Sequence, residues 1–171
     1  QLSTMERPTR PAFRDMQNIL LNKIPNSGMA ISMDYGDALN VHPIKKKEVA
    51  DRLALLALRN TYGKDVIANG PSAVKAIQKG DNILVSFALA KQLTTADKKE
   101  LIGFELVNDK GIHFQSKASI VKNQVQITIP KGEKIKTVLY AWKPFTTANL
   151  VNEAGLPCST FKLELHAITK N

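Results

Sequence analysis

The chain has 171 residues, of which 43% are hydrophobic, so it is long enough for one full domain or for a domain plus part of another. Its 24 Lys and Arg exceed its 15 Asp and Glu, and the net charge of +9 favours polyanions, acidic surfaces or anionic sugars as partners. A single cysteine, Cys158, excludes an intrachain disulfide and a multi-cysteine metal site, and no apolar run approaches the roughly 20 residues that cross a bilayer.

The first part of the chain has the pattern of an α/β unit. Apolar residues at helical spacing predict a helix over residues 11–23. The short apolar run at residues 29–33 predicts a buried strand that enters a loop. Residues 45–62 form the strongest predicted helix, with Gly63 as its C-terminal cap and an apolar stripe made by Val49, Leu53, Leu56 and Ala57.

From residue 67 onward, short apolar and β-branched runs alternate with turn residues, which predicts an all-β region. Hairpin turns are expected at residues 108–111 and 122–123. We therefore expect an α/β segment over residues 1–66 followed by a small antiparallel β-sandwich over residues 67–171. The predicted strands are residues 83–87, 103–107, 112–118, 125–129, 137–142 and 161–166.

The loop at residues 34–43 is the best candidate for chemistry. It lies between the predicted strand and the long helix, where ligands bind in open α/β sheets. His42 in this loop has the side chain of a general base near neutral pH, and a nearby carboxylate such as Asp37 would fix its tautomer. On composition alone, a surface histidine among turn-forming residues is the commoner explanation of such a loop.

The remaining residues offer weaker sites. His113 lies in a predicted strand and His166 lies near the chain end, so both are expected to be structural. No metal-binding motif and no Gly-rich phosphate loop is present, so neither a metal nor a cofactor is expected. The six Phe, three Tyr and one Trp are not interleaved with basic runs, which argues against a nucleic-acid groove.

Three stretches of the chain carry a family resemblance. They are Pro-Asn-Ser-Gly-Met-Ala-Ile-Ser-Met-Asp at residues 25–34, Asn-Val-His-Pro at 40–43 with residues 47–58 and 61–64, and Tyr-Ala-Trp at 140–142 with residues 148–150 and 152–157. Their order and spacing resemble the sialic-acid-specific 9-O-acetylesterases, which are carbohydrate esterases of the SGNH hydrolase class.

The resemblance implies the last unit of an SGNH-type, flavodoxin-like α/β hydrolase domain followed by the accessory sandwich. It implies that His42 is the catalytic base and that the substrate is O-acetylated sialic acid or a related acetylated sugar. Asp37 is the nearest acid to orient the imidazole, because Leu39 stands where the wider class often has Asp, and a backbone carbonyl is the alternative. Family habit implies a periplasmic or secreted protein, although residues 1–14 have no signal-peptide pattern.

The nucleophile that His42 should serve is not found in the sequence. Neither a Gly-Asp-Ser nor a Gly-Gln-Ser-Asn element is present, and Ser27 and Ser72 lie in turn contexts. We therefore expect the serine to come from an N-terminal segment of the same enzyme and this chain to be inactive alone. Residues 1–66 are too few for a doubly wound sheet, so they should keep an apolar face for that segment or for another copy.

Two other functions stay open at this point. The β region could be a non-catalytic carbohydrate-binding or interaction module, with Trp142 and Tyr140 as stacking residues, although Trp142 is more simply explained as a core residue. Electrostatic binding of polyanions is the third hypothesis, and it predicts steep salt dependence without selectivity among sugars.

Overall fold

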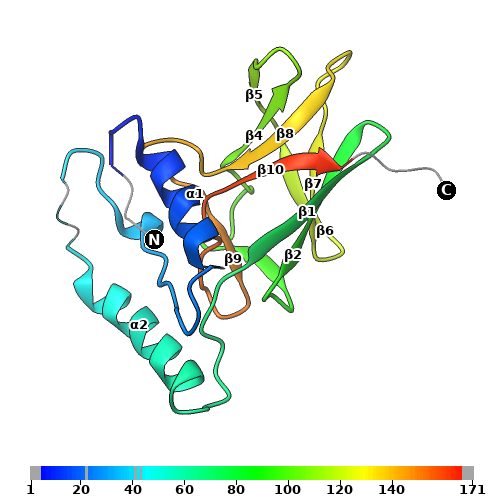
Figure 1. Ribbon diagram of the computed structural model, residues 1–171. Coiled ribbons are helices and arrows are strands. Elements are labelled where there is room, and N and C mark those ends of the chain that lie inside the picture. The colour runs from blue at the N-terminus through cyan, green and yellow to red at the C-terminus, as the bar shows by residue number, and fades with distance from the viewer. Residues whose placement is uncertain (1–4, 22, 41, 43, 167–171) are drawn as a thin grey trace.

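The computed structural model describes residues 5–21, 23–40, 42 and 44–166 (Figure 1). In these ranges the helices are α1 (Arg10–Leu21), the short 3-10 helix η1 (Met33–Tyr35) and α2 (Lys46–Asn60). The strands are β1 (Ser72–Lys79), β2 (Asn82–Ala88), β3 (Leu93–Thr95), β4 (Phe104–Asn108), β5 (His113–Gln115), β6 (Ala118–Val121), β7 (Gln124–Thr128), β8 (Ile135–Tyr140), β9 (Leu150–Asn152) and β10 (Phe161–His166).

Both predicted helices are confirmed to within two residues at each end. The strand predicted at residues 29–33 is wrong, because residues 29–32 have no regular structure and Met33 begins η1. A strand needs neighbours for its backbone hydrogen bonds, and no strand of the described residues pairs with this segment. Its Ile31 carbonyl instead accepts a hydrogen bond from Arg52 Nη1 at 2.5 Å.

Eight strands form one sheet in the order β5-β4-β8-β10-β1-β2-β7-β6, and β3 pairs separately with β9. Each pairing is antiparallel except that of β10 with β1. Residues 161–164 of β10 pair with β8, and residues 165–166 pair with β1, so this strand joins the two halves of the sheet. The expected sandwich is therefore one curled sheet rather than two separate layers (Figure 1).

Most predicted strands are confirmed, and the errors concern three missed strands and one segment that is divided in two. The segment predicted as one strand at residues 112–118 is divided between β5 and β6, and β1, β3 and β9 were not predicted. Both hairpin turns are present. Lys122 and Asn123 have φ of 48° and 60°, which is the backbone of a type I′ turn.

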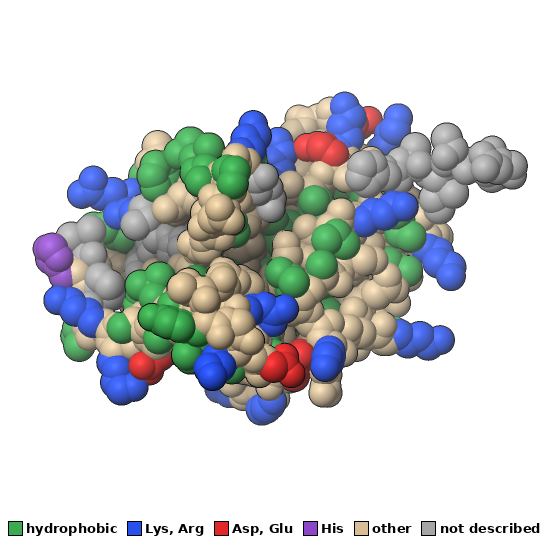
Figure 2. All heavy atoms as spheres, turned by 60° about the horizontal axis from the view of Figure 1, so that its bottom comes forward, with side chains coloured by type: hydrophobic (Ala, Val, Ile, Leu, Met, Phe, Trp, Pro, Cys, Tyr) green, Lys and Arg blue, Asp and Glu red, His purple; other side chains and the backbone are tan. Residues whose placement is uncertain are grey.

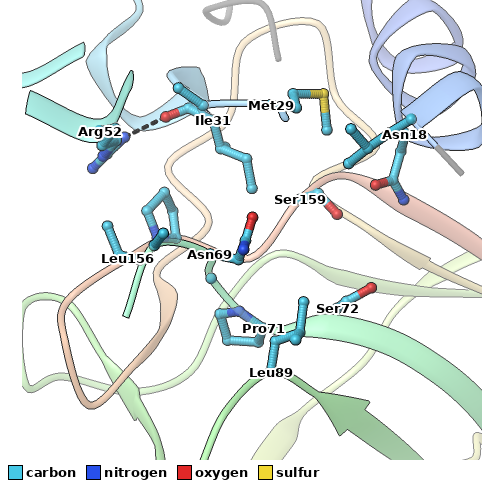
Figure 3. Close-up of a pocket in the computed structure, with 15 residues that line it drawn as sticks. Asn18, Met29, Ile31, Arg52, Asn69, Pro71, Ser72, Leu89, Leu156 and Ser159 are labelled. Atoms are coloured by element: carbon cyan, nitrogen blue, oxygen red, sulfur yellow. Dashed lines mark hydrogen bonds between the residues drawn. The ribbon is translucent and has the colours of Figure 1, made fainter. Parts of the chain in front are cut away.

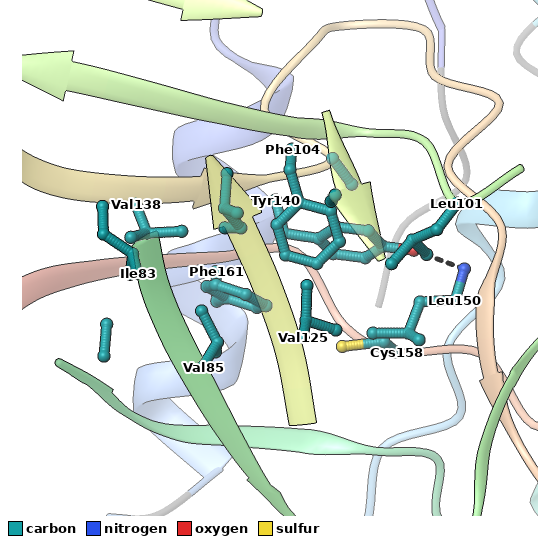
Figure 4. Close-up of a cluster of buried hydrophobic side chains, with 14 of the residues drawn as sticks. Ile83, Val85, Leu101, Phe104, Val125, Val138, Tyr140, Leu150, Cys158 and Phe161 are labelled. Carbon is teal, nitrogen blue, oxygen red and sulfur yellow. Dashed lines mark hydrogen bonds between the residues drawn. The ribbon is translucent and has the colours of Figure 1, made fainter. Parts of the chain in front are cut away.

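The core lies between the two halves of the curled sheet (Figure 4). Phe104 and Tyr140 have ring centroids 4.8 Å apart, and Tyr140 stacks on Phe161 at 5.5 Å. Tyr140 is fully buried, and its hydroxyl accepts a hydrogen bond from the Leu150 N–H at 2.8 Å. Burial raises the pKa of Tyr140 well above its usual value. Because its ring has no exposed surface, the hypothesis that Tyr140 stacks on a sugar is wrong.

Helix α1 lies against β10, on the outer side of the sheet (Figure 1). The link is Arg14, whose side chain is completely buried. Its guanidinium donates to Thr160 Oγ1 at 2.8 Å and to three carbonyl oxygens of the segment after β8, those of Ala141, Lys143 and Pro144, at 2.8, 2.7 and 3.2 Å. Arg14 therefore joins the helical part of the chain to the sheet.

Candidate functional site

A pair of charged residues fixes the start of the loop that carries His42. Arg52 of α2 donates two hydrogen bonds to the carboxylate of Asp34 in η1, at 2.7 and 2.6 Å. The same guanidinium lies over the ring of Tyr35, 4.4 Å from its centroid. Burial opposes the charge on Arg52, but the hydrogen bonds to Asp34 outweigh this effect and raise the pKa of the guanidinium.

The next part of the loop is shaped by its own polar side chains. Asp37 Oδ1 accepts hydrogen bonds from the backbone N–H groups of Leu39 and Asn40 at 2.8 and 2.9 Å. Asn40 Oδ1 accepts one from the His42 N–H at 2.8 Å. These Asx-type bonds bend the backbone so that His42 lies at an exposed position.

The two predicted catalytic residues therefore share one loop. No hydrogen bond joins Asp37 to His42 in the part of the chain that the structure describes, and Asp37 is occupied by the loop backbone. The assignments of His42 as base and of Asp37 as its orienting group stay predictions.

Apolar side chains around this loop are exposed to solvent. Leu39 within the loop is 89% exposed, and Ile44 directly after it is 90% exposed, so neither side chain is covered by the described residues. Figure 2 shows further hydrophobic side chains gathered over the helices. We call this set the open apolar side chains; it comprises Leu39, Ile44, Phe13, Met16, Ile19 and Leu20 of α1, and Leu53 and Leu58 of α2.

The buried side of α2 differs from the predicted stripe. Leu56 is buried, but Leu53 is 53% exposed and Ala57 is also exposed. The second buried residue of the helix is Arg52, one turn before Leu56. The role of Arg52 depends on Asp34, a partner outside the helix, so the sequence alone does not reveal it, although the spacing of Arg52 and Leu56 indicates a shared face.

Two hollows adjoin this region. One of about 280 Å³ is lined by Met33, Asp34 and Gly36 at the beginning of the loop and by residues 145–149. The other, of about 100 Å³, separates α1 and residues 29–31 from the sheet (Figure 3). Ser72 and Ser159 line the second hollow, but its lining residues include no histidine. Within the described residues, therefore, neither hollow brings a serine hydroxyl together with His42.

The other sequence candidates have structural positions. Ser27 donates to the carbonyls of Ile24 and Leu21, as its turn context predicted. His113 lies on β5 with Nδ1 3.3 Å from Glu105 Oε2. His166 ends β10, and its side chain lies outside the described part. Cys158 is completely buried, which raises the pKa of its thiol, as expected of a core residue.

The described residues hold no group of three His, Cys, Asp or Glu side chains placed to bind a metal ion. Among the helices described, none has the length and apolar character needed to cross a membrane.

Comparison with solved structures shows a likeness to a carbohydrate esterase. No family model matches the chain, and no curated protein matches its sequence. Among solved structures it is similar to a novel carbohydrate acetylesterase from Xanthomonas citri, with 25% sequence identity and a TM-score of 0.88. The match covers 95% of this chain and 39% of that one, so the chain spans well under half the length of the esterase. The mixed α/β fold with its curled sheet therefore matches part of a carbohydrate esterase.

Proposed function

We propose that this chain is the C-terminal part of a carbohydrate esterase that removes O-acetyl groups from sugars. The structural likeness to a carbohydrate acetylesterase supports ester hydrolysis on sugars in general. One observation on this chain carries the proposal: the His42 loop is held in shape by Asp37 and Asn40, yet it lies open beside apolar residues that nothing covers. The hydrogen bonds from Asp37 and Asn40 fix the described backbone before His42, and such support suits a catalytic base that works on a group from elsewhere.

In the proposed reaction, His42 takes the proton from a serine hydroxyl as the serine oxygen attacks the acetyl carbonyl. The tetrahedral oxyanion collapses with cleavage of the bond to the sugar oxygen, and His42 returns the proton to that oxygen. Water then hydrolyses the acetyl-serine by the same two proton transfers and releases acetate. Asp37 would orient the imidazole after a rearrangement of its loop bonds, and a backbone carbonyl is the alternative.

The proposed partner is the N-terminal segment of the same enzyme, which would carry the serine. The open apolar side chains support this assignment, because a soluble surface rarely leaves so many large apolar residues uncovered without a partner.

For the substrate, we propose O-acetylated sialic acid. The three stretches that resemble the sialate 9-O-acetylesterases support this choice, and the net charge of +9 favours an anionic sugar. By the same resemblance we propose that the enzyme acts in the periplasm or outside the cell.

The first test uses 4-nitrophenyl acetate with the isolated chain and with the chain assembled with the serine-bearing segment. We expect turnover only from the assembled enzyme. Turnover by the isolated chain would contradict the proposal that the nucleophile is supplied from outside it. Acetate release from 9-O-acetylated N-acetylneuraminic acid and from acetylated xylan then tests the substrate, and a preference for xylan would keep the esterase class but remove the sialate assignment.

A further inference from the structure

A hollow of about 250 Å³ lies on the sheet, apart from the His42 loop. Its floor is made by Glu105 of β4 and Gln115 of β5, which are directly paired across the two strands and therefore point to the same face. Its wall is the segment that follows β8, with Trp142 at one end and residues 145–148 beyond it. We propose that this hollow binds a neutral pyranose unit of a glycan.

Glu105 supplies the first polar contact for such a ring. The residue is only 7% exposed, and its Oε2 lies 3.3 Å from His113 Nδ1. Its other oxygen, Oε1, has no hydrogen-bond partner among the described residues. Every fully buried side-chain oxygen or nitrogen of these residues does have a partner, so Oε1 cannot be fully buried. That oxygen therefore keeps accessible surface and is free to accept a hydrogen bond from a sugar hydroxyl.

Gln115 supplies the second polar contact. Its side chain is exposed at the same end of the hollow, and an amide both donates and accepts. A carboxylate beside an amide matches two neighbouring hydroxyls of a pyranose, each of which also donates and accepts. A purely apolar ligand would desolvate the second carboxylate oxygen of Glu105 without giving it a hydrogen-bond donor, which costs free energy.

Trp142 supplies the apolar contact. Its indole is partly exposed and lines the hollow, and a flat ring of this size packs against the C–H face of a pyranose. The backbone around it is held firmly, because Arg14 binds the carbonyls of Ala141 and Lys143 on both sides of Trp142. Ala141 also has a φ of 53°, an unusual value for a residue with a side chain, which turns Trp142 away from the direction of β8.

The charge of the hollow favours a neutral sugar. The lining residues include one carboxylate, Glu105, and one ammonium group, Lys143, so their formal charges cancel and the hollow has no excess positive charge to attract the carboxylate of an acidic sugar. Residues 145–148 also line the 280 Å³ hollow that reaches Asp34 and Gly36 at the start of the His42 loop. A neutral sugar held at Trp142 would therefore place the rest of the glycan toward that loop. This extension rests on the proposed function, but the binding of the sugar at Trp142 does not.

Trp142 is the single tryptophan of the chain, so its fluorescence reports on this hollow alone. The probes are xylohexaose, cellohexaose and lacto-N-tetraose as neutral oligosaccharides, and N-acetylneuraminic acid as the acidic sugar. We expect a saturable change with at least one neutral oligosaccharide and none with the acid. Glu105→Gln should weaken binding about 10-fold, and Gln115→Ala, at an exposed position, should weaken it several-fold. Trp142→Ala should abolish binding, which is measured by calorimetry because this variant has no tryptophan fluorescence.

His42→Ala is the matched control, and it should leave sugar binding unchanged even where it removes esterase activity. Failure of all three neutral probes, binding of the acid alone, or unchanged affinity in both Gln115→Ala and Trp142→Ala would overturn the proposal. Loss of sugar binding with intact ester hydrolysis in Trp142→Ala would leave the esterase function standing, so the two proposals fail separately.

Discussion

Replacing Arg14 with Met tests whether one buried guanidinium holds the helical part of the chain on the sheet. The substitution keeps an unbranched apolar side chain of similar length but removes every donor. Thr160 Oγ1 and the carbonyls of Ala141 and Lys143 would then lose hydrogen bonds of 2.7 to 2.8 Å. Of these residues, Ala141 is 1% exposed and Thr160 is 0% exposed, so water cannot readily replace the donor without rearrangement.

Each buried acceptor that loses its donor costs about 1–3 kcal/mol, so the two groups together cost about 2–6 kcal/mol, with Thr160 toward the lower end because its hydroxyl still contacts Met33 Sδ at 3.6 Å. This cost is partly offset, because the native protein itself loses stability by burying the charge of Arg14. Burial, and to a smaller extent the nearby Arg10, lowers the pKa of Arg14 to about 10. Because the Met variant no longer buries a charge, we expect a net loss near the lower end, about 2–3 kcal/mol in the free energy of unfolding.

Urea denaturation followed by far-UV circular dichroism measures this loss. Arg10→Met, one turn earlier on the same helix, is the matched control and should change the unfolding free energy by no more than about 0.5 kcal/mol. Arg14→Lys should fall between the two, because a single ammonium reaches fewer of the acceptors. A loss below about 0.5 kcal/mol for Arg14→Met would refute the idea that Arg14 joins the two parts.

Three further predictions concern single residues. Arg52→Met should lower the unfolding free energy by about 2–3 kcal/mol in urea titrations. Adding Asp34→Asn should recover part of that loss, because it removes the carboxylate that the first substitution leaves unpaired. Additive losses in the double variant would argue against a coupled pair. The buried, high-pKa thiol of Cys158 should resist iodoacetamide at pH 8 in the folded protein and react fully in urea, and fast labelling of the folded protein would contradict its burial. Gly103→Ala should lower the unfolding free energy by about 2–3 kcal/mol, because Gly103 has a φ of 100° and the new Cβ would lie 2.5 Å from a side-chain carbon. Gly111→Ala, with a φ of 78° and open space around the new Cβ, should lower it by about 1 kcal/mol. Equal losses in urea titrations would show that the close contact at Gly103 adds nothing.

Features set by neighbouring residues could be predicted from the sequence. The two helices follow from apolar spacing, and the loop around His42 follows from Asp37 and Asn40, whose side chains bend their own backbone. The turn at Lys122 and Asn123 is equally local, and it is confirmed.

Features that depend on distant partners could not be predicted. Strand β1 was missed for a local reason: it pairs with the next strand, β2, but it carries Lys75 and Gln78 and has too little alternation of buried and exposed positions to give a strand pattern. Arg14 and Arg52 resemble ordinary surface residues of amphipathic helices until their partners on other segments are known. Residues 29–33 have the composition of a buried strand, but the neighbours that would make them one are not among the described residues.

In the proposed mechanism, the imidazole of His42 acts on a hydroxyl from a different segment. The most direct measurement is the kcat for acetyl-ester hydrolysis by the assembled enzyme carrying His42→Ala, with His113→Ala as the control on β5. We predict that kcat falls by about 1,000-fold or more for His42→Ala with little change in KM, and stays near normal for the control. A His42→Ala enzyme that keeps its kcat within a few-fold of the unaltered enzyme would contradict the account.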